Sequence, residues 1–237
     1  MSCLPDNDSQ VAQDYLLEGN PNSDTLIVLA HGAGANMHHD FMCQLASLLV
    51  AQGYGVYRFN FLYMQANMQD GKRRPPDRAP KLLSHLESVL ADIYAKQDQA
   101  VISAKRIVLV GKSMGSRMMA WLSSSLHECD NADAKQALEQ VLGVVCLGYP
   151  FVPLKGGEPR LEPLNQSSMP ILVLQGERDK FGNPQQISQW PLRDGVEVVP
   201  IVDGDHSFVP RKSSGTSLNA NLNVAVSQIH EFIRDLS

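Results

Sequence analysis

One serine of the chain stands between two glycines, in the segment GKSMG at positions 111–115, which has the pattern G-x-S-x-G. A serine nucleophile in this pattern needs a sharp turn between a strand and a helix, where larger neighbours than glycine would clash with the sheet. The apolar run RIVLV precedes the motif and an amphipathic pattern follows it. This setting predicts Ser113 as a nucleophile. The alternative is a glycine-rich turn that contains an uninvolved serine.

A serine hydroxyl is a poor nucleophile near neutral pH and needs a base within hydrogen-bond reach. Where this motif occurs in a parallel sheet, the acid and then the histidine follow the serine along the chain. Asp179 follows the apolar run ILVLQ, in the turn GERD, and His206 follows VEVVPI, in the loop DGDHSF. Both therefore come after the carboxyl ends of strands, on the edge that also carries Ser113. We predict these three residues as the catalytic triad, in which Asp179 orients the imidazole of His206.

Three other carboxylates lie near these positions. Glu177 stands two residues before Asp179 and is a competing acid. Asp203 and Asp205 belong to the same loop as His206, which is the wrong place for the acid that orients it. We therefore favour Asp179 and keep Glu177 as the alternative.

The oxyanion of a tetrahedral intermediate needs two preorganised N–H donors, and the loss of one costs about 3 kcal/mol. We predict the backbone N–H of Met114, directly after the nucleophile, as the first donor. The second should come from the loop HGAGA at positions 31–35, where we favour Ala33 and then Gly34. His31 is interpreted as a residue that shapes this loop. A dinucleotide-binding loop is the alternative, but G-x-G-x-x-G is not completed here.

The apolar and amphipathic segments alternate along the chain, which predicts an α/β fold: a mostly parallel sheet with helices on both faces. Continuous apolar runs are typical of buried parallel strands. The predicted strands are Leu26–Ala30, Gly55–Phe59, Arg106–Val110, Gly143–Leu147, Ile171–Gln175 and Val196–Ile201. Helical apolar stripes run through 41–49, 82–93, 114–126 and 222–233. We expect one domain over residues 1–237.

Two segments, 60–80 and 148–170, fit neither helix nor strand in the sequence pattern. Each directly follows a predicted strand, so both are expected to wall a site at the carboxyl edge of the sheet. The proline-rich segment 148–170 is too short for paired lid helices, so we expect no large lid domain. Phe61, Tyr63 and Phe151 are the predicted substrate-binding residues of these walls.

The composition excludes several classes of function. A net charge of −5 does not favour nucleic acid, which needs clustered positive charge. No segment approaches the ~20 apolar residues of a membrane span, and the N-terminus has no pattern of a signal peptide. The four cysteines lack metal-site spacing. We expect a cytoplasmic protein that acts on a small-molecule acyl substrate, with no metal, no cofactor, no nucleic acid and no membrane partner.

Several of these segments together resemble a known family. LIVLAHGAG, RFNFLYM, GKRRPPDR, VLVGKSMGSR, LGYPF and VLQGERDKFG are similar to the small predicted hydrolases of the dienelactone-hydrolase-like type. Related domains occur in α/β-hydrolase-like subunits of eukaryotic chromatin complexes. The resemblance covers about residues 26–208 and implies an α/β-hydrolase fold with the triad given above. Dienelactone hydrolases proper carry a cysteine nucleophile, whereas this chain has Ser113. Leu62 stands where similar members often have proline.

These observations predict a serine hydrolase that acts on a small carboxylic ester or thioester through an acyl-serine intermediate. Two alternatives remain open at this point. One is a non-catalytic binding module on the same scaffold, and the other is a peptidase or amidase.

Overall fold

The computed structural model describes residues 15–20 and 22–236. In this part of the chain seven strands form one sheet, in the order β1-β3-β2-β4-β5-β6-β7. Only β1 runs antiparallel to its neighbour, and the other pairings are parallel. The strands are β1 Tyr15–Gly19, β2 Thr25–Ala30, β3 Gly55–Phe59, β4 Arg106–Lys112, β5 Val141–Leu147, β6 Ile171–Gly176 and β7 Val196–Ile201.

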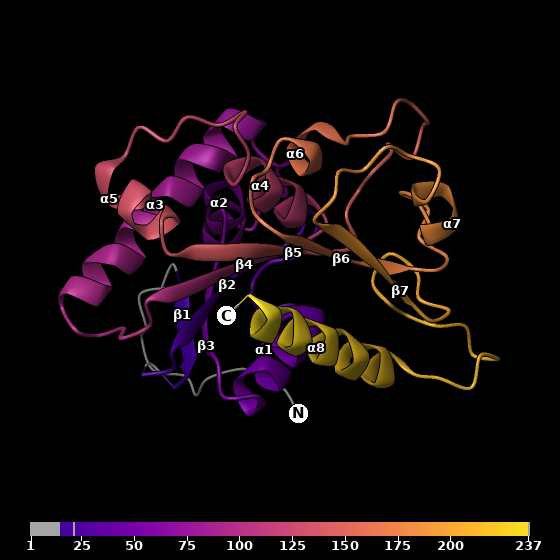
Figure 1. Cartoon of the computed structure of the whole chain (residues 1–237), viewed down its shortest axis with the longest axis horizontal. Coiled ribbons are helices and arrows are strands. Elements are labelled where there is room, and N and C mark those ends of the chain that lie inside the picture. The colour runs from indigo at the N-terminus through magenta and orange to yellow at the C-terminus, as the bar shows by residue number, and fades with distance from the viewer. Residues whose placement is uncertain (1–14, 21, 237) are drawn as a thin grey trace.

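Helices cover both faces of this sheet (Figure 1). They are α1 Asp40–Ala51, α2 Leu62–Asp70, α3 Ala79–Asp98, α4 Met114–Leu122, α5 Ala132–Leu138, α6 Glu162–Asn165, α7 Pro184–Ile187 and α8 Leu218–Asp235. Helices α1 and α8 pack on one face, whereas α3, α4 and α5 pack on the other. The buried apolar side chains form two clusters, one on each face of the sheet. Alternate side chains of β2 belong to different clusters: Val28 packs in the cluster that includes α3, and Leu29 in the one that includes α1. The predicted α/β fold with a mostly parallel sheet is confirmed.

All six predicted strands are present, and the four predicted helical stripes correspond to α1, α3, α4 and α8. The third stripe ends earlier than predicted, because α4 stops at Leu122 and Leu126 is exposed. The hydroxyls of Ser123 and Ser124 donate to the carbonyls of Ala120 and Trp121, three residues back. Such local hydrogen bonds compete with helix continuation.

The two segments without a sequence pattern differ from each other. Residues 62–70 of the first form α2, which has almost no amphipathic pattern and buries only Tyr63 and Met64. The second contains α6, a single turn of four residues. No large lid domain is therefore present in the described part of the chain. No helix there is long and apolar enough to cross a membrane.

Strand β1 is linked to β3 by an ion pair between a buried arginine and a half-buried glutamate. Arg58 is only 2% exposed, and its Nε and Nη2 atoms donate to the carboxylate of Glu18 at 2.5 and 2.8 Å. The same guanidinium donates to the carbonyl of Met37, in the loop before α1. Arg58 therefore connects both the edge strand β1 and the loop before α1 to strand β3.

We expect Glu18→Ala to lower the free energy of unfolding by about 2–3 kcal/mol, because it leaves the buried guanidinium without its carboxylate. Asp70→Ala is the matched control. It breaks the Arg74–Asp70 pair, whose side chains are both more than a third exposed, so stability should hardly change. Urea unfolding of both variants checks this, and equal stabilities of the two would contradict the role given to Arg58.

Candidate active site

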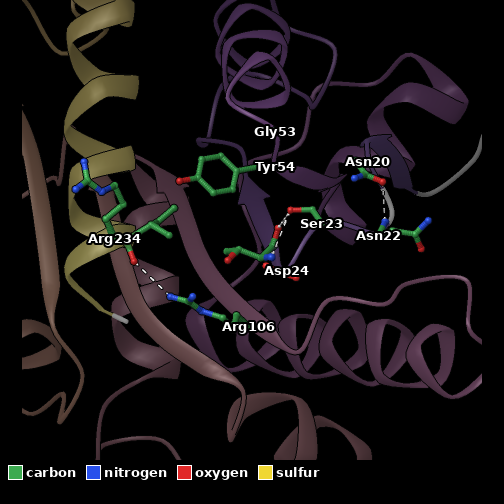
Figure 2. Close-up of a pocket in the computed structure, with 10 residues that line it drawn as sticks. Asn20, Asn22, Ser23, Asp24, Gly53, Tyr54, Arg106 and Arg234 are labelled. Carbon is green, nitrogen blue, oxygen red and sulfur yellow. Dashed lines mark hydrogen bonds between the residues drawn. The ribbon is translucent and has the colours of Figure 1, made fainter.

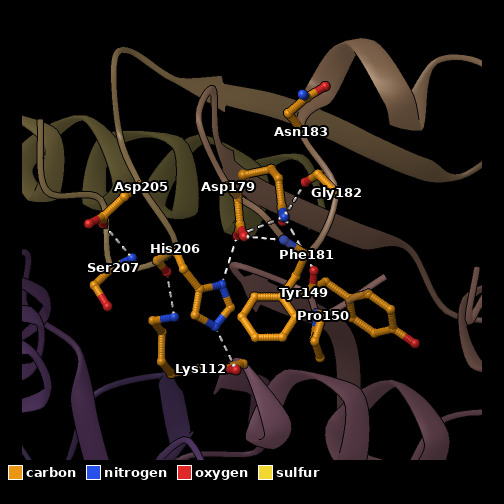
Figure 3. Close-up of polar contacts among 12 residues, drawn as sticks. Lys112, Tyr149, Pro150, Asp179, Phe181, Gly182, Asn183, Asp205, His206 and Ser207 are labelled. Atoms are coloured by element: carbon orange, nitrogen blue, oxygen red, sulfur yellow. Dashed lines mark hydrogen bonds and ion pairs between the residues drawn. The ribbon is translucent and has the colours of Figure 1, made fainter. Parts of the chain in front are cut away.

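Three polar side chains meet at the carboxyl edge of the sheet, just after β4, β6 and β7 (Figure 3). The Oγ atom of Ser113 lies 2.7 Å from Nε2 of His206. Nδ1 of the same imidazole lies 2.8 Å from Oδ2 of Asp179, whose side chain is fully buried. With its proton on Nδ1, the imidazole donates to Asp179 and accepts from the hydroxyl of Ser113. The structure thus brings together the three residues predicted from the sequence.

Ser113 occupies the turn between β4 and α4 in a backbone conformation that side chains rarely adopt, with φ 53° and ψ −113°. Its N–H donates to the carbonyl of Leu147 at 3.0 Å, which fixes the turn against β5. A Cβ atom on Gly111 would lie 2.4 Å from the carbonyl carbon of Gly115, and one on Gly115 would lie 2.6 Å from the carbonyl oxygen of His31. Both glycines of the motif are therefore required by close backbone approach.

The carboxylate of Asp179 is held from several sides. Oδ1 accepts from the N–H of Phe181 at 2.9 Å, and Oδ2 accepts from the amide of Gln175 at 2.9 Å as well as from His206. The ring of Phe181 also packs against the imidazole, with 4.4 Å between the ring centres. These contacts orient the carboxylate and the imidazole together.

The competing carboxylates have other partners. Glu177 accepts from the backbone N–H of Asp203 at 2.7 Å, so it links its turn to the histidine loop and does not contact the imidazole. Asp203 pairs with Arg211 and Arg178, and the hydrogen bond from Arg211 lowers the pKa of this carboxyl. Asp205 accepts from two N–H groups of its own loop. Asp179 is thus the carboxylate that the structure places against His206.

The loop after β2 lies beside the nucleophile, as predicted for the second N–H donor. A Cβ atom on Gly32 would lie 3.4 Å from Cβ of Ser113. Tyr63 donates through its hydroxyl to the carbonyl of Ala33 at 3.1 Å, which fixes the peptide between Ala33 and Gly34. Met114 is the first residue of α4, so its N–H belongs to the unpaired amino end of that helix.

His31 shapes this loop, as interpreted from the sequence. Its Nδ1 lies 2.7 Å from the carbonyl oxygen of Gly32, and the N–H of Phe61 donates to its Nε2 at 3.0 Å. The imidazole must be neutral to accept from Phe61 while it donates to Gly32. Burial lowers the pKa of His31 to about 4, which is consistent with this neutral form. His31 therefore links the loops that follow β2 and β3.

The predicted substrate-binding residues lie deeper than expected. The side chains of Phe61 and Phe151 are fully buried, and Tyr63 is nearly so. Phe61 packs edge-on against the rings of Phe59 and His31, while Phe151 packs against Tyr149 and Trp190. Phe61 and Phe151 therefore have no exposed surface with which to contact a substrate. The apolar contacts that they make under the loops account for this difference from the sequence prediction.

Open space adjoins the loop after β2. One cavity of about 240 Å³ is lined by Ala33 and Gly34 together with Met64, Asn67 and residues 71–74. A second, of about 430 Å³, is lined by the same two loop residues with 73–76. The segment 60–80 thus forms a wall beside the predicted oxyanion donors, as expected.

A further pocket, of about 400 Å³, lies at the opposite edge of the sheet (Figure 2). It is lined by Thr25 and Arg106, the first residues of β2 and β4, with Tyr54 and Arg234 nearby. Since Ser113 follows the other end of β4, this pocket is separate from the candidate site. Among residues 15–20 and 22–236, no group of three or more His, Cys, Asp or Glu side chains could hold a metal ion.

Lys112 is the residue of this site whose place the sequence did not indicate. It is only 7% exposed, and its Nζ donates to the backbone carbonyl of His206 at 2.7 Å. The sequence signal that could have indicated its burial is the position of a charged residue at the end of an otherwise apolar strand.

Comparisons with known proteins agree with this fold. No curated protein sequence matches the chain. Among solved structures, a dienelactone hydrolase from Anabaena variabilis is similar, with 18% identity, coverage of 92% of this chain and 90% of that one, and a TM-score of 0.64. An α/β serine hydrolase without a lid from Xanthomonas campestris has 19% identity, coverage of 93% and 88%, and a TM-score of 0.59. An esterase from Pyrococcus furiosus has 15% identity, coverage of 91% and 84%, and a TM-score of 0.63.

At these identities the solved structures show a shared fold. The family itself is shown by sequence, since a model of the alpha/beta hydrolase domain matches residues 23–234. This match includes all strands from β2 to β7 and the three side chains that meet at the carboxyl edge. The chain therefore belongs to the α/β-hydrolase domain family.

Proposed function

We propose that this hydrolase cleaves a small carboxylic ester or thioester through an acyl-serine intermediate, with Ser113, His206 and Asp179 as its catalytic triad. The observation that carries the proposal is the continuous hydrogen-bonded chain from Oγ of Ser113 through the imidazole to the buried carboxylate. A serine activated in this way attacks a carbonyl carbon, and the neighbouring base accepts its proton.

In the proposed reaction, Oγ of Ser113 bonds to the carbonyl carbon while its proton moves to Nε2 of His206. Asp179 stabilises the resulting imidazolium through Nδ1–H. The N–H of Met114 and that of Ala33 or Gly34 donate to the oxyanion. The imidazolium then gives its proton to the departing alcohol or thiol. Water then attacks the carbonyl carbon of the acyl-serine, with His206 again as base. The acid is released and Ser113 recovers its proton.

Each of these steps is assigned to a side chain, a backbone N–H or water, so the proposal requires no metal and no cofactor. The names of similar structures, a dienelactone hydrolase and an esterase, support a carboxylic ester or lactone as substrate. We also propose a cytoplasmic location and no nucleic-acid or membrane partner. Cys129 and Cys146 are thiols outside any disulfide, which suits a reducing compartment.

A non-catalytic binding module is the competing hypothesis. It gives no reason for a serine in a strained turn to lie 2.7 Å from an imidazole that is itself held by a buried carboxylate. Strained backbone of this kind is concentrated at functional sites. A peptidase or amidase would use the same groups, and only a panel of ester, thioester and amide substrates distinguishes it.

Ser113→Ala and His206→Ala should each lower kcat for a short-chain p-nitrophenyl ester by roughly a millionfold, since nucleophile and base act as a unit. Both variants should remain folded, because neither side chain belongs to the apolar core. Ser113 should also react with a fluorophosphonate probe in the wild type. Esterase activity of more than a few per cent in Ser113→Ala would refute the assignment of the nucleophile.

Asp179→Asn should lower kcat by roughly 10⁴-fold, because the amide favours the wrong tautomer of His206. Glu177→Gln is the matched control. Its amide oxygen can still accept from the N–H of Asp203, so the effect on kcat should be small. Steady-state kinetics of the two variants decide the matter, and a reversal of the two effects would move the acid to Glu177.

Acyl chain length should matter little beyond about six carbons, because each methylene contributes about 0.8 kcal/mol only when it is buried. The segment 148–170 has a single helical turn, so nothing in it could roof a long acyl tunnel. We expect good activity on acetyl to butyryl esters, measured as kcat/KM across a series of acyl lengths. A steady rise up to dodecanoyl would instead mean that the segment 60–80 closes over the acyl chain as a lid.

A further inference from the structure

Lys112 is a buried lysine directly before the nucleophile, at the end of β4. Lysine is almost never buried without a partner, because removing its charge from water is costly. Here the partner of the ammonium is the main-chain carbonyl of His206, at 2.7 Å (Figure 3). Two residues adjacent in sequence, Lys112 and Ser113, thus contact the same residue of a distant loop, one through its backbone and the other through its imidazole.

The ammonium of Lys112 remains mostly charged near neutral pH, although its burial disfavours the charge. Burial lowers the pKa of Lys112 to about 8, and this is opposed by the charges of Asp179 and Asp205. The ring of Phe41, on α1, lies 5.7 Å from Nζ on another side. A protonated lysine donates a stronger hydrogen bond than a neutral group does, so its contact with the carbonyl is charge-assisted.

Gly148 leaves the space that this contact needs. It follows β5 with φ 61°, in the left-handed region that favours glycine. A Cβ atom at this position would lie 2.9 Å from the carbonyl oxygen of His206, 3.1 Å from Nζ of Lys112 and 3.3 Å from Nδ1 of the imidazole. The lysine and the glycine therefore belong to one arrangement around the backbone of His206.

The loop that carries His206 needs such an anchor. It is exposed at Val202 and Val209, and both Asp203 and Phe208 have positive φ values. Glu177 and Arg178 hold this loop from the side of β6, through Asp203. Lys112 holds it from the side of β4, the strand that ends at the nucleophile.

We propose that Lys112 is a positioning residue, whose ammonium holds the backbone of His206 so that Nε2 stays within reach of Ser113. This inference rests on the proposed function. It adds that two groups maintain the distance between base and nucleophile: Asp179, and Lys112 at the end of β4. A displacement of about 1 Å in such a pair can cost about 100-fold in rate.

The test is Lys112→Met, which keeps an unbranched buried chain but removes the donor. We expect kcat for a short-chain ester to fall about 30–100-fold, with KM changed less than about threefold. The rate of fluorophosphonate labelling of Ser113 should fall in parallel, since it depends on the same base. The melting temperature, measured alongside, shows that the assay samples folded protein. Lys180→Met is the control: it removes an exposed lysine next to Asp179, and its kcat should equal that of the wild type.

Two results with Lys112→Met would overturn the inference. An unchanged kcat and labelling rate would mean that the position of the imidazole does not depend on Lys112. A rise in KM alone would mean that the ammonium acts on the substrate and not on His206. A loss of activity in the wild type itself, with no labelling of Ser113, would overturn the proposed function together with this inference. Normal wild-type activity that Ser113→Ala abolishes and Lys112→Met retains would overturn this inference only.

Gly148→Ala tests the same contact from the other side, and it serves alone if Lys112→Met does not fold. Its methyl group would displace the ammonium or the carbonyl, so kcat should fall while KM stays nearly constant. In the double variant the two effects should combine to less than their product, because residues that share one contact are not additive. A full multiplication of the two effects, or a Gly148→Ala variant with wild-type kcat, would contradict a shared contact.

Discussion

The hydrogen bond between Ser113 and His206 joins residues 93 positions apart in the chain, and it depends on the register of the parallel strands between them. Ser113 follows β4, Asp179 follows β6 and His206 follows β7, with β5 and its loop in between. Because all four strands run in the same direction, their carboxyl ends meet at one edge. A shift of one residue in any strand would turn its side chains to the opposite face of the sheet and separate the three groups. The two apolar clusters, one on each face, hold that register.

The site contains several features that work against the stability of the fold. Ser113 has a positive φ, and the side chains of Asp179 and Lys112 carry charge in buried positions. A strained residue costs about 1–3 kcal/mol and persists only where the surrounding structure determines it. The surroundings here are tightly packed, since β4 and β6 are buried on both faces. The packing of these central strands thus offsets the free-energy cost of the strained backbone and of the buried charges, which exposed loops alone could not do.

The sequence predicted the strands and the three central residues because both depend on local patterns. A buried parallel strand is a continuous apolar run, and the motif around Ser113 carries its own glycines. Strand β1 was missed because it is half-buried and so lacks a continuous apolar run, and its ion pair connects Glu18 to Arg58, 40 positions away. Helix α2 was missed for a related reason, since it has scarcely any apolar stripe. Phe61 and Phe151 were predicted to bind substrate but are fully buried, because a sequence pattern does not show which way a residue points after a strand ends. Lys112 was missed because its partner is a backbone carbonyl 94 positions away.

The loop after β2 shows how a histidine outside the triad contributes to the same site. His31 can bridge Gly32 and Phe61 only as a neutral imidazole, and burial lowers its pKa from 6.5 to about 4. An unfolded chain would take up a proton at this residue between those two pH values, whereas the folded protein would not. The contribution of His31 to folding stability is therefore complete above about pH 6.5 and decreases as the pH falls towards 4. Within the neutral range the bridge is intact, so the backbone of Ala33 and Gly34 is in place before a substrate arrives. A preorganised N–H donor stabilises an oxyanion without reorganisation during the reaction, which is the advantage of building this loop on a buried, uncharged ring.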